Sequence, residues 1–298
     1  MTAMPHFDWH RPTTLAEAHR LLLDTPPGPN GASLIAGGTD LVPKMRAGAR
    51  MPSRVVSLGG ITELSHVEYS PERGLTIGAT ARISEVGALP PVREHYFALE
   101  RACAQMATPQ VRNMGTVVGN LANGSPCADT AAPLLVLDAV VEIASPSGRR
   151  MLPIAEFHRG PGHVALEPGE IAVALHLPPP RAGSASAYLR HSARSLVDMS
   201  AVGVAGRLLC DPDGTVVEAR LAISAVAPTP RRCPEAEALL LGTRPDAARI
   251  RAAAETCAAA ARPIDDVRAS ASYRRHMVRV LAQRVLAVLL SNHSGGQA

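Results

Sequence analysis

The chain has 298 residues, of which 46% are hydrophobic and 19% charged, and it carries a formal net charge of +4. This length exceeds what one hydrophobic core usually organises, so we expect two or three compact units and exclude both a single small module and a largely disordered chain. Because the arginines are scattered and aromatic residues make up only 3% of the chain, the sequence has neither the basic stripe nor the aromatic platforms of a nucleic-acid-binding protein.

The first third of the chain mixes helices and strands around a pair of glycines. A capping-box pattern at 14–17 predicts a helix that begins at residue 15. Short apolar strands are predicted at 33–36, 54–58 and 74–78. The first of these strands runs directly into Gly37-Gly38-Thr39-Asp40. Successive backbone N–H groups can converge on an anion there without a Cβ in the way, so the loop is a candidate pyrophosphate site, although a plain tight turn would have the same residues.

The middle third carries a second glycine-spaced stretch, at 115–120. A helix is predicted from 96 to 106, and Thr108-Pro109 should end it before this stretch begins. The glycines permit close backbone approach to a ligand, while Thr116 and Asn120 supply side chains that form hydrogen bonds. Two separated glycine loops in one mixed unit suggest an extended ligand with a diphosphate at its centre.

The segment after the second loop has the form of another helix start. Ser125 is a good N-cap and Pro126 suits the first helical position, so we expect a short helix that contains Asp129. The Asp129 carboxylate could accept hydrogen bonds from ribose or ribityl hydroxyls. An aspartate in the first turn of a helix is also favoured by the helix dipole alone, so this residue by itself leaves both interpretations open.

Three consecutive prolines, Pro178, Pro179 and Pro180, mark the predicted domain boundary, because proline cannot continue a central strand. Before them, a hairpin is predicted with a strand at 140–144 and a turn at 147–149. Beyond them, strands are predicted near 201–209 and 221–226. The last helix, from about 273 to 290, has an apolar stripe along one side.

The chain shows no further constellation that would carry out catalysis by itself. It contains no G-x-G-x-x-G or P-loop motif, no G-x-S-x-G elbow, and no metal-ligand spacing among its eleven histidines. Arg194 and Asp198 are four residues apart and predict a surface ion pair. Between residues 188 and 198, only Arg190 is a candidate for contact with a cofactor.

Five cysteines are spread along the chain without a C-x-x-C pair, at Cys103, Cys127, Cys210, Cys233 and Cys257. This pattern favours a reducing compartment and argues against an iron–sulfur or zinc site in this chain. No apolar stretch typical of a secretory signal opens the sequence, and no later run is long enough to span a bilayer. We therefore expect a cytoplasmic protein.

Five short motifs occur in an order that resembles a known family. They are Ala-Gly-Gly-Thr-Asp-Leu at 36–41, Thr-Val-Val-Gly-Asn at 116–120, Ser-Pro-Cys-Ala-Asp at 125–129, Pro-Gly-Glu-Ile at 168–171 and Tyr-Leu-Arg…Arg…Asp at 188–198. Over nearly its whole length the chain resembles the FAD-binding (medium) subunits of molybdenum hydroxylases, of the xanthine dehydrogenase and carbon monoxide dehydrogenase type.

The resemblance implies an α+β protein with a two-subdomain FAD-binding fold of the vanillyl-alcohol-oxidase-like (PCMH) type, followed by a smaller α/β C-terminal domain. The expected divisions are 1–179 for the FAD domain, with subdomains of about 1–57 and 58–179, then 184–290 for the C-terminal domain and 291–298 for a flexible tail.

The resemblance also implies which residues hold FAD. The expected cofactor-binding residues are Leu34, Ile35, Ala36, Gly37, Gly38, Thr39, Asp40, Leu41, Thr116, Gly119, Asn120, Asp129, Ile171, Ala172 and Arg190. The first eight would wrap the pyrophosphate, and Ile171 and Ala172 would flank the ring system. Two departures stand out. Val118 replaces a glycine that is usual in the family, so its side chain must point away from the diphosphate, and Arg190 replaces a lysine that is frequent there.

Under this resemblance the chain is the electron-transfer subunit of an oxidoreductase. A molybdopterin-binding large subunit would hydroxylate the substrate, and [2Fe–2S] clusters in a small subunit would pass electrons to FAD in this chain, which would reduce NAD, a quinone or oxygen. No catalytic residue, metal, nucleic acid or membrane span is expected in the chain itself. Two other interpretations stay open from the residues: a self-contained flavin oxidase of the same fold, and a non-enzymatic nucleotide-binding assembly module.

Overall fold

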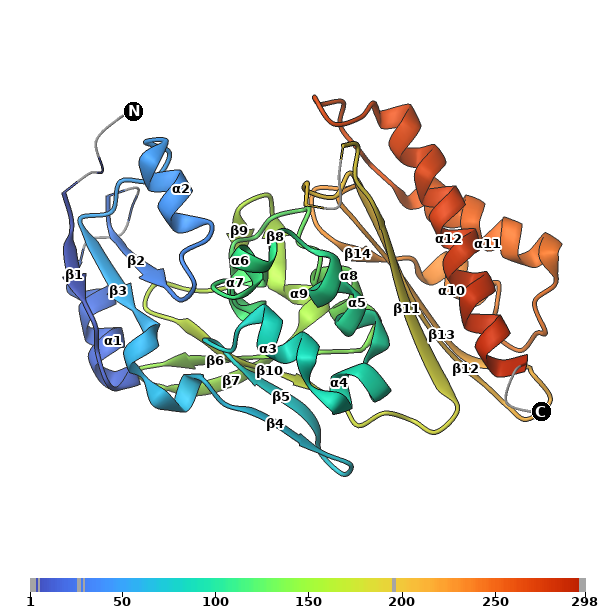
Figure 1. Ribbon diagram of the computed structural model, residues 1–298, viewed down its shortest axis with the longest axis horizontal. Helices are drawn as coiled ribbons and strands as arrows, with labels where there is room; N and C mark the ends of the chain where they lie inside the picture. Colours follow the sequence, from blue (N-terminus) through green and yellow to red (C-terminus); the bar gives the residue numbers. More distant parts are fainter. Residues whose placement is uncertain (1–3, 5, 26–27, 29, 195–196, 295–298) are drawn as a thin grey trace.

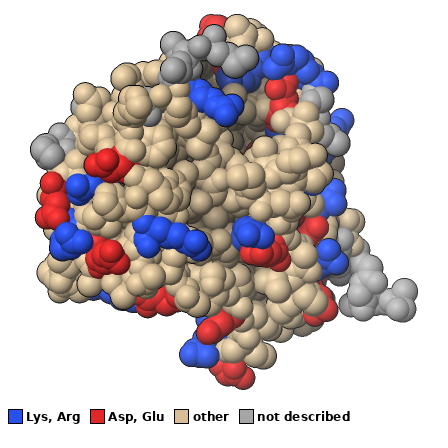
Figure 2. Space-filling model, turned by 60° about the vertical axis from the view of Figure 1, so that its left-hand side comes forward, with Lys and Arg blue, Asp and Glu red and all other residues tan. Residues whose placement is uncertain are grey.

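A computed structural model describes residues 4, 6–25, 28, 30–194 and 197–294 (Figure 1). The N-terminal elements lie at the left of Figure 1 and the C-terminal helices at the right, and the chain forms three main β-sheets between them. Basic and acidic side chains are mixed over the face shown in Figure 2. In the part of the chain that the structure describes, no helix is both long and apolar enough to cross a membrane.

The N-terminal sheet is small and parallel. Its strands are β1 (Asp8–His10), β3 (Arg54–Ser57) and β2 (Ala32–Ile35), in that spatial order. Helix α1 (Leu15–Leu23) begins where the capping-box pattern predicts, because the Thr14 hydroxyl accepts a hydrogen bond from the Glu17 N–H at 3.2 Å. A second helix, α2 (Leu41–Arg46), follows the loop after β2 directly.

The central sheet is antiparallel and has the order β4-β5-β10-β6-β7. Its strands are β4 (Val67–Ser70), β5 (Gly74–Gly78), β6 (Val140–Ser145), β7 (Gly148–Pro153) and β10 (Ile171–Leu177). Helices α3 (Ile83–Ala88), α4 (Pro90–His95), α5 (Phe97–Gln105), α6 (Pro109–Arg112), α7 (Val117–Ala122) and α8 (Ala131–Val136) lie on one side of it (Figure 1). The predicted hairpin at 140–153 is confirmed, and β10 is buried because it lies between β5 and β6.

Short elements complete this part of the fold. They are the 3-10 turns at Leu58–Gly60 and Thr62–Leu64, helix α9 (Ile154–Phe157), and the two-stranded pair β8 (His158–Gly160) and β9 (His163–Val164).

The C-terminal sheet is sandwiched between two groups of helices (Figure 1). Its strands, in the order β11-β12-β13-β14, are β11 (Ser184–His191), β12 (Val202–Cys210), β13 (Val216–Ser224) and β14 (Arg231–Arg232). The helices α10 (Pro234–Ala238), α11 (Ala247–Ala260) and α12 (Ala271–Ser294) follow. Helix α12 packs on β11 and β12, while α5 contacts β11 and α8 contacts β12 and β13. The predicted apolar stripe of the last helix is confirmed at Val278, Leu281, Val285 and Leu289.

Around the second glycine loop, the helix predicted at 96–106 is confirmed as α5, which ends at Gln105, before Thr108-Pro109. Pro109 then begins a separate short helix, α6, because the Thr108 hydroxyl accepts a hydrogen bond from the Val111 N–H at 3.3 Å. The predicted open loop was wrong. Residues 115–120 are not an open loop, since α7 begins at residue 117 and Gly119 lies within it. A glycine inside a helix gives no local signal of the helix, so the sequence pattern indicated a loop.

The predicted helix start at Ser125 was also wrong. The Ser125 hydroxyl accepts a hydrogen bond from the N–H of Cys127 at 3.2 Å, but this bond closes a turn and does not cap a helix. The chain makes turns until α8 begins at Ala131. Asp129 therefore lies in a turn. At the other end of the chain, α12 continues to Ser294, past the expected helix end at 290, and residues 295–298 lie outside the described residues.

Candidate functional site

A cavity of about 710 Å³ lies where the loops after β2, before α7 and before β10 meet a segment that follows β11. This volume lies within the usual range for a small-molecule or cofactor site. All the residues that the sequence predicts to bind the cofactor line this cavity, except Arg190. At its edge, the pairing of β10 with β6 shifts register between Ala172 and Ala174, as strands often do beside a binding site.

The glycine pair brings the first two loops together. A Cβ at Gly37 would lie 2.0 Å from the Met114 carbonyl oxygen and 2.7 Å from the Gly115 Cα, so only glycine fits there. Gly38 has a φ of +73°, a left-handed conformation that side chains rarely adopt. The predicted loop lines the cavity, but the structure gives Gly37 a different role from the one expected. Gly37 makes room for the neighbouring backbone rather than for a ligand.

The first loop presents a row of unpaired donors at the start of α2. The backbone N–H groups of residues 38–41 have no hydrogen-bond partner among the residues that the structure describes, and these residues line the cavity. The α2 bonds begin only with the Val42 N–H, which donates to the Gly38 carbonyl at 3.0 Å. Unpaired N–H groups at the start of a helix suit phosphate oxygens. The N–H groups of residues 38–41 therefore form a cradle that fits the diphosphate of a dinucleotide.

The second loop is held mainly by bonds within the chain. Thr116 caps α7, with its hydroxyl accepting from the Gly119 N–H at 3.0 Å. Asn120 accepts from the Thr130 hydroxyl at 2.7 Å and so fixes the start of α8. Although Val118 is among the residues that line the cavity, its side chain is only 3% exposed and packs in the hydrophobic core. Val118 is therefore compatible with a ligand in the cavity.

Two cations at the cavity were missed by the sequence analysis. Lys44 Nζ donates to Asn123 Oδ1 at 2.5 Å, and Asn123 Nδ2 donates to Asp40 Oδ1 at 3.0 Å, so the first two loops are also joined by side chains. Burial raises the pKa of Asp40, and the charge of Lys44 opposes that shift. Arg50 lines the cavity and donates to Ser33 at 3.1 Å. The only signal for Lys44 in the sequence was its position four residues after Asp40.

Asp129 connects the cavity with the C-terminal half of the chain. Its Oδ1 accepts hydrogen bonds from the Tyr188 hydroxyl at 2.8 Å and from the Ser200 hydroxyl, and the Arg190 Nε lies 3.3 Å away. Burial raises the pKa of Asp129, while Arg190, Ser200 and Tyr188 oppose the shift. Tyr188 and Ser200 were missed because they are 59 and 71 residues away in the sequence.

Arg190 is not among the residues that line the cavity. Its side chain is 2% exposed, and it donates to the Gln105 carbonyl at 2.9 Å and to the Asp198 carbonyl. The predicted ion pair between Arg194 and Asp198 is confirmed at 2.7 Å, although neither of these two residues is helical. The Asp198 residue lines the cavity together with Val197 and Met199.

The reactive groups at the cavity do not form a catalytic or metal-binding constellation. Burial raises the pKa of the Cys127 thiol at the cavity wall, so the thiolate is disfavoured. All five cysteines are free. Within the described ranges, no three His, Cys, Asp or Glu side chains are grouped in a way that could hold a metal ion.

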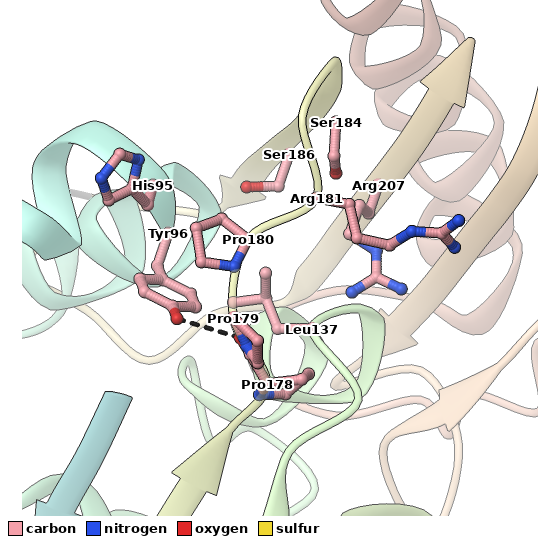
Figure 3. A pocket seen from close by; sticks show the side chains of 10 residues that line it. All are labelled: His95, Tyr96, Leu137, Pro178, Pro179, Pro180, Arg181, Ser184, Ser186 and Arg207. Carbon is pink, nitrogen blue, oxygen red and sulfur yellow. Dashed lines mark hydrogen bonds between the residues drawn. The ribbon is translucent and has the colours of Figure 1, made fainter. Parts of the chain in front are cut away.

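A second cavity, of only about 30 Å³, lies beneath the proline linker (Figure 3). Its space suits a water molecule rather than a cofactor. The Tyr96 hydroxyl donates to the Pro178 carbonyl at 2.9 Å and ties the linker to the end of α4. The two cavities share no lining residue.

The sequence matches two family models that together cover almost the whole chain. Residues 5–180 match the FAD binding domain in molybdopterin dehydrogenase, and residues 187–289 match the CO dehydrogenase flavoprotein C-terminal domain. The chain belongs to the family of FAD-binding subunits of molybdenum hydroxylases. Its fold is thus an FAD-binding domain followed by a C-terminal domain, its cofactor is FAD, and the protein is an oxidoreductase subunit.

Relatives of known identity align over nearly their full length. The xanthine dehydrogenase FAD-binding subunit of Escherichia coli O157:H7 is 34% identical, covering 96% of this chain and 97% of the relative. The carbon monoxide dehydrogenase medium chain of Afipia carboxidovorans is 33% identical, covering 94% and 95%. The structure of carbon monoxide dehydrogenase from Hydrogenophaga pseudoflava superposes with a TM-score of 0.92 at 31% identity, covering 97% of this chain and 99% of the matched chain.

Proposed function

We propose that this FAD-binding subunit transfers electrons within a molybdenum hydroxylase complex, and that the substrate is oxidised in a different chain. When bound, FAD supplies a two-electron store between one-electron clusters and an external acceptor, for which NAD, a quinone and oxygen are the candidates. The observation that supports this best is the cavity itself. It offers unpaired backbone donors for a diphosphate and lacks, in the described residues, an acid–base or metal constellation for substrate chemistry.

The residues of the chain would divide the work of binding FAD. The N–H groups of 38–41 would receive the diphosphate, with Lys44 and Arg50 adding positive charge near it. Thr116, Gly119 and Asn120 would form the second wall of the cradle. Ile171 and Ala172, which are 0% and 5% exposed at the start of β10, would flank the ring system. The other predicted site residues, Leu34, Ile35, Ala36, Gly37 and Asp129, also line the cavity, and only Arg190 does not.

We further propose the finer architecture that the resemblance implies. The parallel N-terminal sheet and the antiparallel central sheet would be the two subdomains, of about 1–57 and 58–179, of an α+β fold of the vanillyl-alcohol-oxidase-like (PCMH) type. The boundary near 179–184 is supported by the gap between the two family matches, which end at 180 and resume at 187. A cytoplasmic location is supported by the five free cysteines.

The expected partners are a molybdopterin-binding large subunit and a [2Fe–2S] small subunit. Support comes from the relatives, which include a subunit of a 6-hydroxypseudooxynicotine dehydrogenase complex and medium chains of carbon monoxide dehydrogenase. A self-contained flavin oxidase and a non-enzymatic assembly module are not favoured, because the named relatives are subunits or medium chains of dehydrogenases.

The test is to purify the tagged full chain from its native cells under mild conditions and to measure FAD, molybdenum and iron in the same fractions. We expect the three to co-elute in a fixed ratio, while the chain produced alone retains FAD without the metals. FAD-loaded chain that elutes free of molybdenum and iron, and that oxidises small alcohols by itself, would contradict the proposal and favour the oxidase.

A further inference from the structure

Only one of the two oxygens of the Asp129 carboxylate is held by the described residues. The Tyr188 hydroxyl, the Ser200 hydroxyl and the Arg190 guanidinium all approach the same oxygen, Oδ1. The two hydroxyls donate hydrogen bonds to this oxygen, while the Arg190 Nε forms an ion pair with it and donates to the Ser200 hydroxyl at 2.7 Å. All three groups come from the part of the chain after the proline linker, whereas Asp129 precedes it. Asp129 nonetheless lines the large cavity. Its second oxygen, Oδ2, receives no hydrogen bond from the described residues.

We propose that Tyr188, Ser200 and Arg190 are positioning residues, which fix Asp129 so that its Oδ2 accepts a hydrogen bond from a sugar hydroxyl of FAD. This inference rests on the proposed FAD binding and adds residues that touch no ligand themselves. A carboxylate paired with a guanidinium can only accept hydrogen bonds, and the ribityl and ribose parts of FAD both carry hydroxyl donors.

The three groups can fix the carboxylate because they are themselves buried and held by other contacts. Tyr188 is 1% exposed and Ser200 is 0% exposed, and the Arg190 guanidinium is anchored by the Gln105 carbonyl at 2.9 Å. A binding group whose rotamer is locked before the ligand arrives loses less conformational entropy on binding. FAD affinity should therefore depend on the seating of the C-terminal half against the FAD domain.

Tyr188→Phe tests the inference, since it removes one hydroxyl and keeps the ring. The chain offers a control in Tyr96→Phe, because Tyr96 is also buried, at 2% exposed, and its hydroxyl donates to the Pro178 carbonyl at the small cavity, which shares no lining residue with the large one. Both variants of the full chain should lose some thermal stability. Only Tyr188→Phe should weaken FAD binding, by roughly three- to tenfold in Kd, because the Asp129 carboxylate is then held less firmly while its own contact with FAD is kept.

A double-mutant cycle shows whether Tyr188 acts through Asp129. In the Asp129→Asn background, Tyr188→Phe should change the Kd for FAD little, because the group that it positions is already altered. Should Asp129→Asn not fold, Ser200→Ala combined with Tyr188→Phe replaces it, and the two effects should again be non-additive. Titration of the wild type and Tyr188→Phe with FMN and with ADP identifies the hydroxyl: weaker FMN binding indicates the ribityl chain, and weaker ADP binding indicates the ribose.

The outcomes separate this inference from the proposed function. Wild-type chain that binds no FAD overturns the proposed function. Wild-type chain that binds FAD, with an unchanged Kd in Tyr188→Phe, overturns only the inference. Equal weakening by Tyr96→Phe, additive effects in the cycle, or a loss seen with neither FMN nor ADP would likewise overturn it.

Discussion

Gly37 shows how a single residue determines the geometry of the large cavity. Its missing Cβ lets the loop after β2 rest on the carbonyl of Met114, at the edge of the second loop. The two loops together present their backbones to the same cavity. Its neighbour Gly38 is needed for its left-handed φ, and not for that contact. The two adjacent glycines are therefore required for different physical reasons.

Gly37→Ala should separate the two loops. The added Cβ would meet backbone atoms that cannot move aside cheaply, so we expect a loss of roughly 1–3 kcal/mol in the free energy of unfolding and a clear loss of FAD affinity. Urea unfolding and FAD titration of the full chain measure the two effects. Gly160→Ala is the control, because a Cβ there meets nothing within 4 Å. Equal behaviour of the two variants would refute the role of Gly37.

At the residue scale, the sequence could indicate sites that are continuous in the chain. The cavity-lining residues at 34–41 were found because a strand, two glycines and a polar pair stand next to one another. The partners of Asp129 could not be found, because burial and long-range packing bring them together. The resemblance implies that Arg190 binds the cofactor, whereas its guanidinium forms an ion pair with Asp129 and does not line the cavity.

At the scale of elements, predictions succeeded where local chemistry determines the outcome. The α1 cap and the β6–β7 hairpin depend on residues within a few positions of each other. The prediction at Ser125 failed because a serine hydroxyl can serve an N–H two residues later in a turn or the first-turn N–H groups of a helix, and only the tertiary structure decides between them.

The turn before α12 gives a prediction about pH. Burial alone would raise the pKa of Asp266, but hydrogen bonds from the Arg268 N–H at 2.7 Å and from Arg274 at 2.7 Å lower it to about 2. Because this pKa lies below its unfolded value, Asp266 stabilises the fold fully above the unfolded pKa, and this contribution is lost as the pH falls toward about 2.

Asp266→Asn should therefore lower the Tm at neutral pH, and the difference from wild type should shrink as the pH falls. Thermal unfolding over a series of pH values measures this difference. The exposed Asp213→Asn provides a control in which little stability should be lost at neutral pH. A difference that stays constant down to acid pH would contradict the role of Asp266.

At the scale of the whole molecule, the two halves are joined by polar contacts as well as by apolar packing. Asp138, in the turn between α8 and β6, lies within hydrogen-bond reach of Arg207 at 2.6 Å, Arg220 at 3.3 Å and Arg232 at 3.4 Å, all on the C-terminal sheet. Its φ of +52° is a conformation that aspartate and asparagine tolerate better than most residues.

Asp138→Asn keeps this backbone preference and removes the charge. We expect a loss of about 1 kcal/mol in the free energy of unfolding, because three guanidinium groups lose a shared partner at a site that is partly exposed. The loss should be smaller at high salt, which screens both the attraction and the remaining repulsion. Urea unfolding at low and high salt measures the loss. A loss that does not depend on salt would contradict an electrostatic attraction between Asp138 and the three arginines.

Titration of the FAD-free full chain with FAD, followed by flavin absorbance and fluorescence, tests the central claim most directly. The structure predicts saturable binding of one FAD per chain, weakened by Gly37→Ala and unaffected by Gly160→Ala. Absence of saturable binding, or equal binding by Gly37→Ala and the wild type, would contradict the claim that the two joined loops hold FAD in this cavity.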